Sequence, residues 1–312
     1  MAINVLVIGD VMLDQYMKGS VRRKSPEADI PVLDQVKTRI EVGGAANVAL
    51  NAKLLDCNVH LIGVVGRDVK AKTLSSLLYQ HNINASLIED ESRPTTVKTR
   101  IFNNSDQIVR VDEESTADID AIIQEEVLTQ LDNLLSIQKF HVAILQDYNK
   151  GVLCAKLIPQ IISKLKTKGI FIAVDPKEKN IELYQGVNLF KPNLNELKKW
   201  GSIEKSKKFN KNWVERLAEE LREKICAEKV LVTLSENGCF YTSKNTSAFK
   251  SAIPIEVADV CGAGDAVMVV AALATFENKT IDEILSISVK AGRIVCLKEG
   301  VSTISMEELN EK

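Results

Sequence analysis

The stretch Asp259-Val260-Cys261-Gly262-Ala263-Gly264-Asp265, followed by the apolar run of residues 266–274, decides how this chain folds. Two glycines on either side of an alanine allow the backbone to turn sharply and to approach a ligand closely. The run behind them contains neither proline nor glycine, so we expect a buried helix that begins at the turn. Free amides at a helix start, aligned with the helix dipole, form an anion site.

Asp265 stands at this expected anion site. A carboxylate there can take a proton from a hydroxyl, while the neighbouring amides of Gly262, Ala263 and Gly264 hold the negative charge that develops nearby. This arrangement suits phosphoryl transfer to an alcohol, in which positioning and electrostatics supply most of the catalysis. The alternative is an aspartate that only caps a helix N-terminus, where this residue type is favoured.

The composition is that of an ordinary globular protein, and 312 residues can bury a sizeable core. With 42 acidic and 40 basic residues, the charge balance offers no argument for binding nucleic acid or a membrane. The cysteines lie far apart without a C-x-x-C pair, as in a reduced cytosolic protein. The apolar residues 5–8 are followed at once by Gly9-Asp10, too early for a signal peptide or a membrane span. We expect a cytoplasmic protein.

Strands and helices alternate along most of the chain. Apolar runs predict strands at residues 3–8, 59–65, 142–145, 170–174, 189–190 and 230–234. Helical patterns are found at residues 118–135, 152–166, 211–226 and 281–296, and a helix of small residues follows Gly43-Gly44. This alternation predicts an α/β fold, a mostly parallel sheet covered by helices on both faces, as a single domain over residues 1–312.

Two stretches depart from this alternation. Residues 30–36 and 38–42 are short alternating pieces between charged and Ser-Pro turns, and residues 95–101 and 107–111 flank the turn cluster Asn103-Asn104-Ser105-Asp106. Neither stretch has enough apolar surface to be stable alone. We expect them to form one small β-sheet lid, from about residues 12–41 and 93–112. An exposed edge strand of such a lid would be covered by homodimerisation.

Two motifs could bind a sugar. Gly43-Gly44-Ala45-Ala46-Asn47 lets a helix start and the Asn47 amide approach a polyhydroxylated ligand, because a Cβ at the glycines would obstruct a sugar ring. Tight packing of a helix on the sheet would favour the same small residues. Asp14 lies just past the first strand, at the end where open α/β sheets place their ligands.

Three other expected strand ends could bind a nucleotide. Lys191-Pro192-Asn193-Leu194-Asn195-Glu196 is either a capping box built on Asn193 and Glu196, or a place for phosphates with Mg²⁺ held by Glu196 through water, and the two are compatible. In the segment 233–238, small hydroxyl residues and a glycine could receive phosphates and ribose, although many turns look alike. Lys177, after Asp175-Pro176, could place a cation near the phosphates, or it could be an exposed loop lysine without a role. The nucleotide-binding residues predicted here are Asn193, Asn195, Glu196, Lys177, Thr233, Ser235, Gly238 and Gly264.

In this order and spacing, G-G-A-A-N-V-A at 43–49, K-P-N-L-N-E at 191–196 and D-V-C-G-A-G-D at 259–265 resemble the ribokinase-like carbohydrate kinases. The resemblance covers essentially the whole chain. A closer one, to the D-glycero-β-D-manno-heptose-7-phosphate kinases, rests on G-D-V-M-L-D-Q-Y at 9–16, R-K-S-P-E-A at 23–28, T-T-V-K-T-R at 95–100, D-Y-N-K-G at 147–151 and D-P-K at 175–177. In many bacteria that kinase is fused to a C-terminal adenylyltransferase, and this chain, which stops at residue 312, resembles the kinase unit standing alone.

The resemblance implies a ribokinase-like fold and a kinase that uses ATP and Mg²⁺. It implies that Asp265 is the catalytic base, with the amides of residues 262–264 as the anion hole and Asn193 and Glu196 organising metal and phosphate. It assigns sugar binding to Asp14, Gly43, Gly44 and Asn47. For a phosphate already on the sugar we add four lid cations, chosen for charge and location: Arg23, Lys98, Arg100 and Arg110.

Three residues depart from the family pattern. Cys261 replaces the Thr usual before Gly-Ala-Gly, Val289 stands where relatives often carry an Asn near the adenine, and Gln146 stands where a Ser is more usual. None removes the base or the anion hole. We expect phosphorylation of D-glycero-D-manno-heptose 7-phosphate at O1, to the 1,7-bisphosphate of the ADP-heptose pathway. The alternatives are a ribose, fructose or nucleoside kinase, and a non-catalytic sugar-binding regulator.

Overall fold

The computed structural model describes residues 2–204 and 208–311. Within these ranges a nine-stranded sheet has the order β13-β12-β11-β10-β9-β8-β1-β4-β5, parallel except where β12 pairs with β11 and β13. The predicted mostly parallel sheet is therefore confirmed. Its strands are β1 (Asn4–Gly9), β4 (Asn58–Val65), β5 (Asn84–Glu89), β8 (Val142–Gln146), β9 (Phe171–Asp175), β10 (Leu189–Phe190), β11 (Lys229–Thr233), β12 (Cys239–Ser243) and β13 (Thr246–Lys250).

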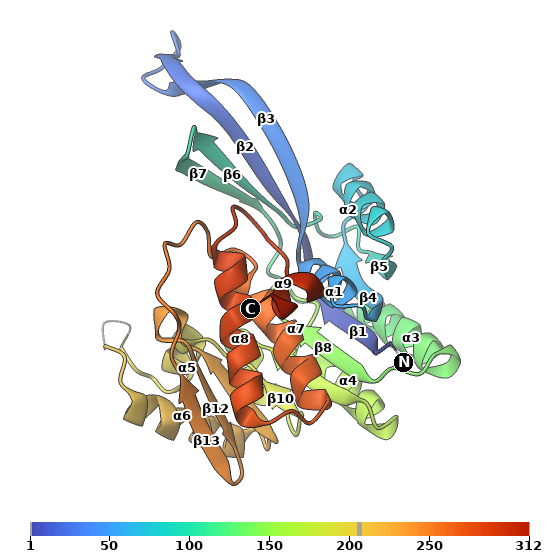
Figure 1. Ribbon diagram of the computed structural model, residues 1–312. Helices are drawn as coiled ribbons and strands as arrows, with labels where there is room; N and C mark the ends of the chain where they lie inside the picture. Colours follow the sequence, from blue (N-terminus) through green and yellow to red (C-terminus); the bar gives the residue numbers. More distant parts are fainter. Residues whose placement is uncertain (1, 205–207, 312) are drawn as a thin grey trace.

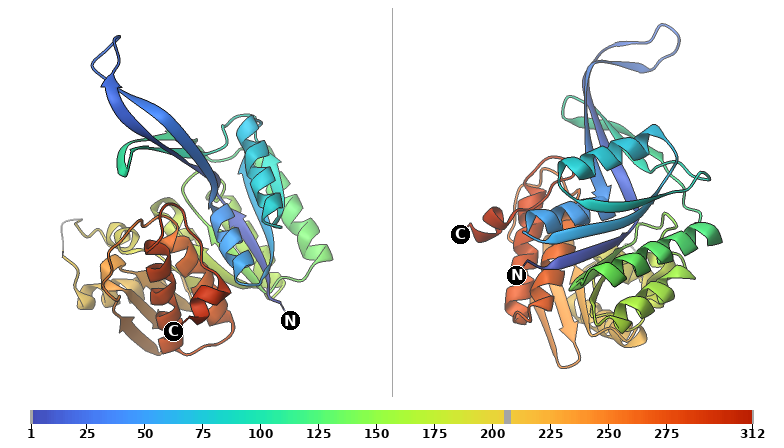
Figure 2. Two further views of the ribbon diagram at one scale, coloured as in Figure 1. Left: turned by 45° about the horizontal axis from the view of Figure 1, so that its top comes forward. Right: turned by 90° about the vertical axis from the view of Figure 1, so that its right-hand side faces the viewer.

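Helices cover both faces of this sheet (Figures 1 and 2). One face packs against α1 (Ala45–Leu54), α2 (Val69–Gln80), α7 (Ala263–Phe276) and α8 (Ile281–Cys296). The other packs against α3 (Ala121–Ile137), α4 (Leu157–Thr167), α5 (Leu194–Trp200) and α6 (Lys211–Lys224), and α9 (Met306–Asn310) follows α8. Within β1, Val5 and Val7 join one core and Leu6 and Ile8 the other, which explains why the strand is apolar throughout.

The helix predicted after the Gly-Ala-Gly turn is α7, and it is buried almost all round. Its run from Asp265 to Ala272 is buried at every position, as expected for a helix without a polar face. In contrast, α6 buries a stripe that includes Val214, Leu217 and Leu221 and exposes the rest to solvent. The N-terminus of α7 therefore has a fixed position against the sheet.

The lid is a four-stranded sheet among the described residues, in the order β3-β2-β6-β7, and it projects from the body of the molecule (Figure 1). Its strands are β2 (Val11–Lys24), β3 (Pro31–Gly44), β6 (Val97–Asn103) and β7 (Asp106–Glu113). Residues 30–36 and 38–42 were expected as two short strands, but all of them except residue 30 belong to the single strand β3. It pairs along β2, and register shifts between Lys18 and Ser20 and between Val21 and Arg23 absorb the irregular pattern.

Two other expectations about helices need correction. The helix expected from residue 152 begins at Leu157, and the Val152 amide, in the loop before it, donates to the carboxylate of Asp10. Helix α2 was not predicted, although it buries Leu74 and Leu78 at helical spacing. Both helices still pack on the faces that the alternation of strands and helices requires.

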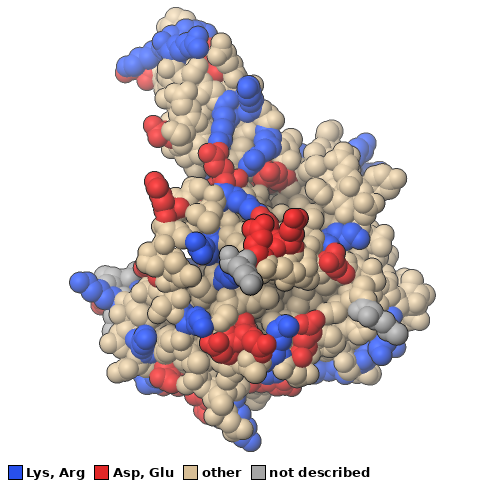
Figure 3. All heavy atoms as spheres, viewed as in Figure 1, with Lys and Arg blue, Asp and Glu red and all other residues tan. Residues whose placement is uncertain are grey.

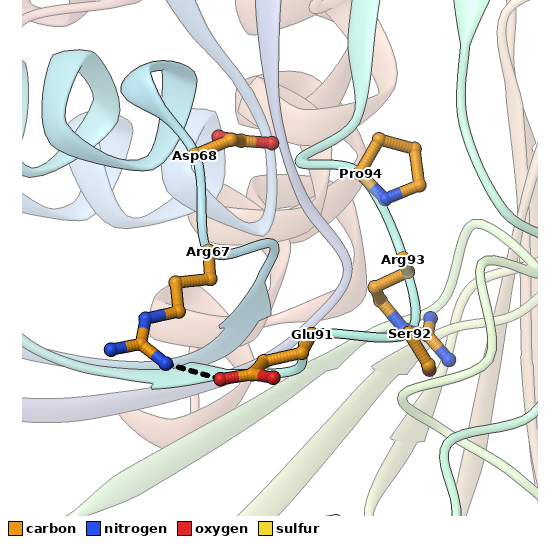
Figure 4. Close-up of a pocket in the computed structure, with 6 residues that line it drawn as sticks. All are labelled: Arg67, Asp68, Glu91, Ser92, Arg93 and Pro94. Atoms are coloured by element: carbon orange, nitrogen blue, oxygen red, sulfur yellow. Dashed lines mark hydrogen bonds and ion pairs between the residues drawn. The ribbon is translucent and has the colours of Figure 1, made fainter.

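The second lid excursion begins at a hollow lined by Arg67, Asp68, Glu91, Ser92, Arg93 and Pro94 (Figure 4). Arg93 donates to Asp90 and to the carbonyl oxygens of Lys150 and Ala117, and Arg67 pairs with Glu91 at the rim. None of the lining residues belongs to the predicted site. We therefore interpret this hollow as the base on which the lid is anchored.

Charged side chains of both signs are interspersed on the face shown in Figure 3. Across residues 2–204 and 208–311, a helix with the length and apolar character needed to span a bilayer is not found.

Candidate active site

The site residues gather at one edge of the large sheet. From β1 the chain continues to β4 and β5 on one side, and later to β8, β9, β10 and β11 on the other. Ligands of open α/β sheets bind at such a reversal, outside the carboxyl ends of the strands. Asp10 follows β1, Gln146 ends β8, Asp175 ends β9, and Asn193 is the third residue after β10.

The N-termini of α1 and α7 meet at this edge. Asn47, in the first turn of α1, is fully buried, and its Nδ2 donates to Oδ2 of Asp265 over 2.7 Å. Gly262 precedes α7 in the left-handed conformation, with φ 82°, and a Cβ there would lie 2.8 Å from the Ser302 carbonyl oxygen. A glycine is therefore required at this position both for the turn and for the close approach.

Asp265 is only 3% exposed, and its carboxylate faces neighbouring side chains of the site. The Tyr148 hydroxyl donates to Oδ1 over 2.9 Å, and Gln146 Nε2 donates to the same oxygen over 3.2 Å. Burial, helped by the nearby charge of Asp175, raises the pKa of Asp265 to about 7, against the lowering effects of the Asn47 and Tyr148 hydrogen bonds and of the Lys191 charge. A general base is most effective when its pKa lies near the working pH.

The anion site beside Asp265 contains main-chain amides and a buried lysine. No partner for the amides of Gly262 and Gly264 is found among the described residues, whereas the Ala263 amide donates to the Val260 carbonyl over 3.3 Å. Lys191 is 2% exposed, and its Nζ lies 3.9 Å from the position that a Cβ on Gly264 would take. The structure therefore adds Lys191 to the predicted amides.

Lys191 is held in place by a buried ion pair with Asp175, over 3.0 Å. Lys191 is part of the Lys-Pro-Asn motif recognised in the sequence, but no function was predicted for it. A lysine that directly precedes the expected phosphate-binding residues was the signal that could have identified it.

The predicted nucleotide loops lie next to each other. Thr233 donates its amide to the Pro192 carbonyl over 3.1 Å, which joins the segments 191–196 and 233–238. Asn193 accepts from the amide of Glu196, and Glu196 Oε2 accepts from the amide of Asn193 over 2.8 Å, so the capping box is formed. The other oxygen of Glu196, Oε1, contacts Lys177.

The remaining predicted nucleotide residues differ in their surroundings. Lys177 is partly buried rather than a free loop lysine, and Asp175 and Glu196 raise its pKa against the effect of burial. Asn195 and Ser235 are exposed at the surface of these loops. Gly238 has φ 92°, and a Cβ there would lie 2.0 Å from the Lys250 carbonyl oxygen, so this glycine is needed for the turn itself.

On the acceptor side, Asp14 and Gly43 are in direct contact. Asp14 is 3% exposed, and a Cβ on Gly43 would lie 2.0 Å from its Oδ2. Gly44 has φ 58°, and a Cβ there would lie 2.4 Å from the Asp10 carbonyl oxygen, so this position too has no room for a side chain. The glycines were expected to make room for a sugar, and in the structure they make room for the Asp14 carboxylate and the turn into α1.

The lid cations are distributed unevenly. Arg100 pairs with Asp14, and Asp112 on β7 pairs both with Lys98 on the neighbouring strand β6 and with Arg110 on its own strand. Cross-strand partners share a face of a sheet, so the register places Asp14, Lys98 and Arg100 on one face of the lid. Arg110 on β7 is the cross-strand partner of Arg100 and lies on this same face.

Arg23 is not brought to this group within one chain. It lies nine residues beyond Asp14 along β2, roughly 30 Å at strand spacing, where it is 60% exposed and pairs with Asp34.

These observations define a class of protein. A buried carboxylate with a pKa near 7, two helix-start amides without a partner among the described residues, and a buried lysine lie at the switch point of an α/β sheet, below a β-sheet lid. Such a site suits an enzyme that transfers a phosphoryl group to a hydroxyl.

The comparison with family models identifies the particular family. The model for the pfkB family carbohydrate kinases matches residues 2–309, so the chain belongs to this family and is an ATP-dependent carbohydrate kinase. The resemblance to ribokinase-like carbohydrate kinases is thereby confirmed.

Curated relatives match almost the whole of this chain. The chain is 36% identical over 309 residues to the bifunctional protein HldE of Aliarcobacter butzleri and 37% identical over 306 residues to that of Helicobacter pylori strain J99. These alignments cover 99% and 98% of this chain but 64% and 65% of the relatives. The chain therefore spans slightly less than two thirds of the length of the relatives it matches.

Solved structures share the fold. Phosphofructokinase-2 from Escherichia coli, in complex with potassium, superposes with a TM-score of 0.79 at 20% identity, covering 99% of this chain and 97% of that one. Ribokinase from Thermotoga maritima superposes with a TM-score of 0.72 at 17% identity, covering 98% of both chains. The ribokinase-like fold is confirmed, including its lid.

Proposed function

We propose that this kinase phosphorylates a heptose 7-phosphate at the anomeric hydroxyl. The observation that carries the proposal is the Asp265 carboxylate, which is buried, has a pKa near 7, and is held by Asn47. Beside it, at the start of α7, are amides that have no partner within residues 2–204 and 208–311. The choice of sugar is supported by the motifs shared with heptose-7-phosphate kinases and by about 36% identity to two HldE proteins.

In the proposed reaction, a bond forms between the acceptor oxygen and the γ-phosphorus of ATP. The bond from that phosphorus to the bridging oxygen breaks, and ADP leaves with the electron pair. Asp265 takes the proton of the acceptor hydroxyl. Lys191 and the amides of Gly262 and Gly264 hold the charge on the transferring group, because they are positioned before the reaction begins.

Glu196 is the residue that would hold Mg²⁺, through water. Lys177 would then give up its ion pair with Glu196 and contact phosphate. A cluster of three or more histidine, cysteine or acidic side chains that could hold a metal is not found among the residues described. This fits Mg²⁺, which keeps several waters and uses one or two carboxylates together with phosphate oxygens. When bound, the ion neutralises charge on the phosphates.

The phosphate already on the acceptor would be bound under the lid. Arg100 and Lys98 lie on the same lid face as Asp14, and Arg100 is nearly buried. The fork of an arginine matches the oxygens of a phosphate. Each cation is paired with a carboxylate in this structure, so the acceptor phosphate would replace part of these ion pairs.

We also propose that the protein is a cytoplasmic homodimer formed through the lid. Val109 and Val111 on β7 and Val36 on β3 are 45%, 46% and 40% exposed. Val109 and Val111 share one face, two positions apart along the strand. Apolar side chains on a projecting sheet favour burial against a second copy.

The test is ADP release in a coupled assay, with heptose 7-phosphate, fructose 6-phosphate, ribose, fructose and nucleosides as acceptors. We expect turnover to require a sugar phosphate, with the heptose preferred and a 1,7-bisphosphate product visible by ³¹P NMR. Preferred turnover of an unphosphorylated sugar or a nucleoside would contradict the proposed substrate. Calorimetric sugar binding without ATP turnover would indicate the regulator instead.

A further inference from the structure

Tyr148 connects the two sides of the site. It lies on the loop after β8; its ring is partly exposed, and its hydroxyl donates to Oδ1 of Asp265 over 2.9 Å. The ammonium of Lys177, which pairs with Glu196, lies 5.3 Å from the centre of the ring. The resemblance to known kinases assigned no role to this tyrosine.

The main chain of this loop is fixed by Asp10. Asp10 is 1% exposed and accepts the amides of Tyr148, Lys150 and Val152 over 2.7, 3.0 and 3.2 Å. Moving the loop would leave a buried carboxylate without these donors, which is costly. The Tyr148 hydroxyl is therefore held at Asp265 before any substrate binds.

Gln146 contacts the same oxygen from another direction. Its Nε2 donates to Asp265 Oδ1 over 3.2 Å and to Asp175 Oδ2 over 3.1 Å. Because both neighbours are carboxylates, the NH₂ group must face them, and the orientation of the amide is determined. Its Oε1 is buried and has no partner among the described residues, so it is available to a hydroxyl group of a ligand.

The two oxygens of Asp265 therefore differ. A carboxylate offers about four lone-pair positions, two on each oxygen. Oδ1 already accepts from Tyr148 and Gln146, whereas among the described residues Oδ2 accepts from Asn47. The open acceptor position is on Oδ2, beside Asn47, which is on the predicted sugar side.

We propose that Tyr148 and Gln146 are positioning residues that occupy Oδ1 of Asp265 and leave Oδ2 as the atom that takes the proton of the acceptor hydroxyl. The inference rests on the proposed function, because it specifies how the base of that reaction is oriented. Gln146, which departs from the family pattern, thereby acquires a role.

The charged groups around Asp265 determine the sign of the expected effect. Asp175 faces it from the end of β9 and raises its pKa, whereas Lys191, after β10, lowers it, and Lys177 is a further cation near the carboxylate. The hydroxyl of Tyr148 also lowers the pKa, because it donates to the ionised form. Removing that hydroxyl must therefore raise the pKa of Asp265.

The test is Tyr148→Phe, which keeps the ring and removes the donor. We expect kcat at pH 7 to fall about tenfold and the acid limb of the kcat–pH profile to move to higher pH, with the acceptor KM unchanged within about twofold. Independently of turnover, the pKa of Asp265 is measured by following the ¹³C NMR signal of its carboxyl carbon during a pH titration. The signal is assigned by its loss in Asp265→Asn. The pKa should rise in Tyr148→Phe.

Tyr184→Phe is the matched control, because Tyr184 is buried and its hydroxyl donates to another carboxylate, Asp147 Oδ2, over 2.7 Å. We expect it to lower Tm without moving the acid limb or the pKa of Asp265. An unchanged Asp265 pKa or an unchanged kcat in Tyr148→Phe, or equal shifts in the two variants, overturns the inference. Failure of the proposed function is distinguishable, since the unmodified chain would then lack turnover with heptose 7-phosphate while the NMR titration still reports on Tyr148.

Discussion

Asn47 and Asp265 are separated by 218 positions in the chain, yet their side chains are joined by a buried hydrogen bond of 2.7 Å. Asn47 belongs to α1, which directly follows the lid strand β3, and Asp265 belongs to the first turn of α7. The orientation of the base is therefore tied to the segment that enters the body from the lid. Both residues are buried, so the contact is shielded from solvent.

Replacing Asp265 by Asn should abolish most of the turnover and leave acceptor binding largely intact. A positioned general base contributes about 10²–10⁴-fold to a rate, so we expect kcat to fall by this factor in the coupled assay. Calorimetry with the acceptor should give a similar Kd. Asp282→Asn, at an exposed helix start, is the control. Near-normal turnover of Asp265→Asn would remove this residue from its assigned role.

The pH dependence of kcat should report the buried base. Burial raises the pKa of Asp265 to about 7, so below this pH the carboxyl is protonated and cannot accept a proton. We expect kcat to rise with pH through about 7 and then to level off. A profile that is already flat at pH 5, near the ordinary range of an aspartate, would contradict this assignment.

Glu196→Gln separates capping from metal binding. Glu196 and Glu283 each accept the amide of their N-cap residue over 2.8 Å, in the capping boxes of α5 and α8. A glutamine can keep this hydrogen bond but carries no charge. We expect a similarly small change in Tm for Glu196→Gln and Glu283→Gln. The Mg²⁺ concentration for half-maximal activity should rise in Glu196→Gln and stay unchanged in the other.

The outcome that would contradict this prediction is an equal Mg²⁺ requirement in the two variants. Glu196 would then be a capping residue, and the metal would be held by other groups.

Arg100→Met should affect both stability and the acceptor. It leaves Asp14 buried without its cation, a change that costs about 3–5 kcal/mol in comparable buried pairs. We therefore expect a lower Tm together with a higher KM for the sugar phosphate. Arg216→Met, which breaks an exposed pair with Glu220 on α6, should change neither. An unchanged KM would exclude Arg100 from phosphate binding.

Val111→Glu tests the homodimer. A charge on the apolar lid face should prevent its burial against a second copy, so we expect the variant to sediment as a monomer where the unmodified chain sediments as a dimer. Val69→Glu, at a valine of α2 that is 76% exposed outside the lid, is the matched control. If Val111→Glu and the unmodified chain sediment alike, the lid is not the interface.

Much of the site was visible in the sequence because its residues stand in short motifs at strand ends. Asp265, Asn47 and Glu196 each belong to such a motif, and each lies where the switch point of the sheet requires. Tyr148 and Lys191 stand in recognised motifs, but no function was predicted for them because their partners are distant in the chain. The hydroxyl of Tyr148, for example, contacts Asp265 across 117 positions. Hydrogen bonds over such separations depend on strand order, which local patterns do not contain.

The sequence by itself determined the class of fold and the lid, and it supplied the prediction that Asp265 is the base, because apolar periodicity and glycine spacing are local properties of the chain. Only the tertiary structure decided which lid cation meets Asp14, since the distance along β2 excludes Arg23 within one chain and the side chain that forms the ion pair is that of Arg100, two positions along β6 from the register partner of Asp14. It also decided which oxygen of Asp265 stays open, because that depends on three donors from two distant segments meeting at one carboxylate.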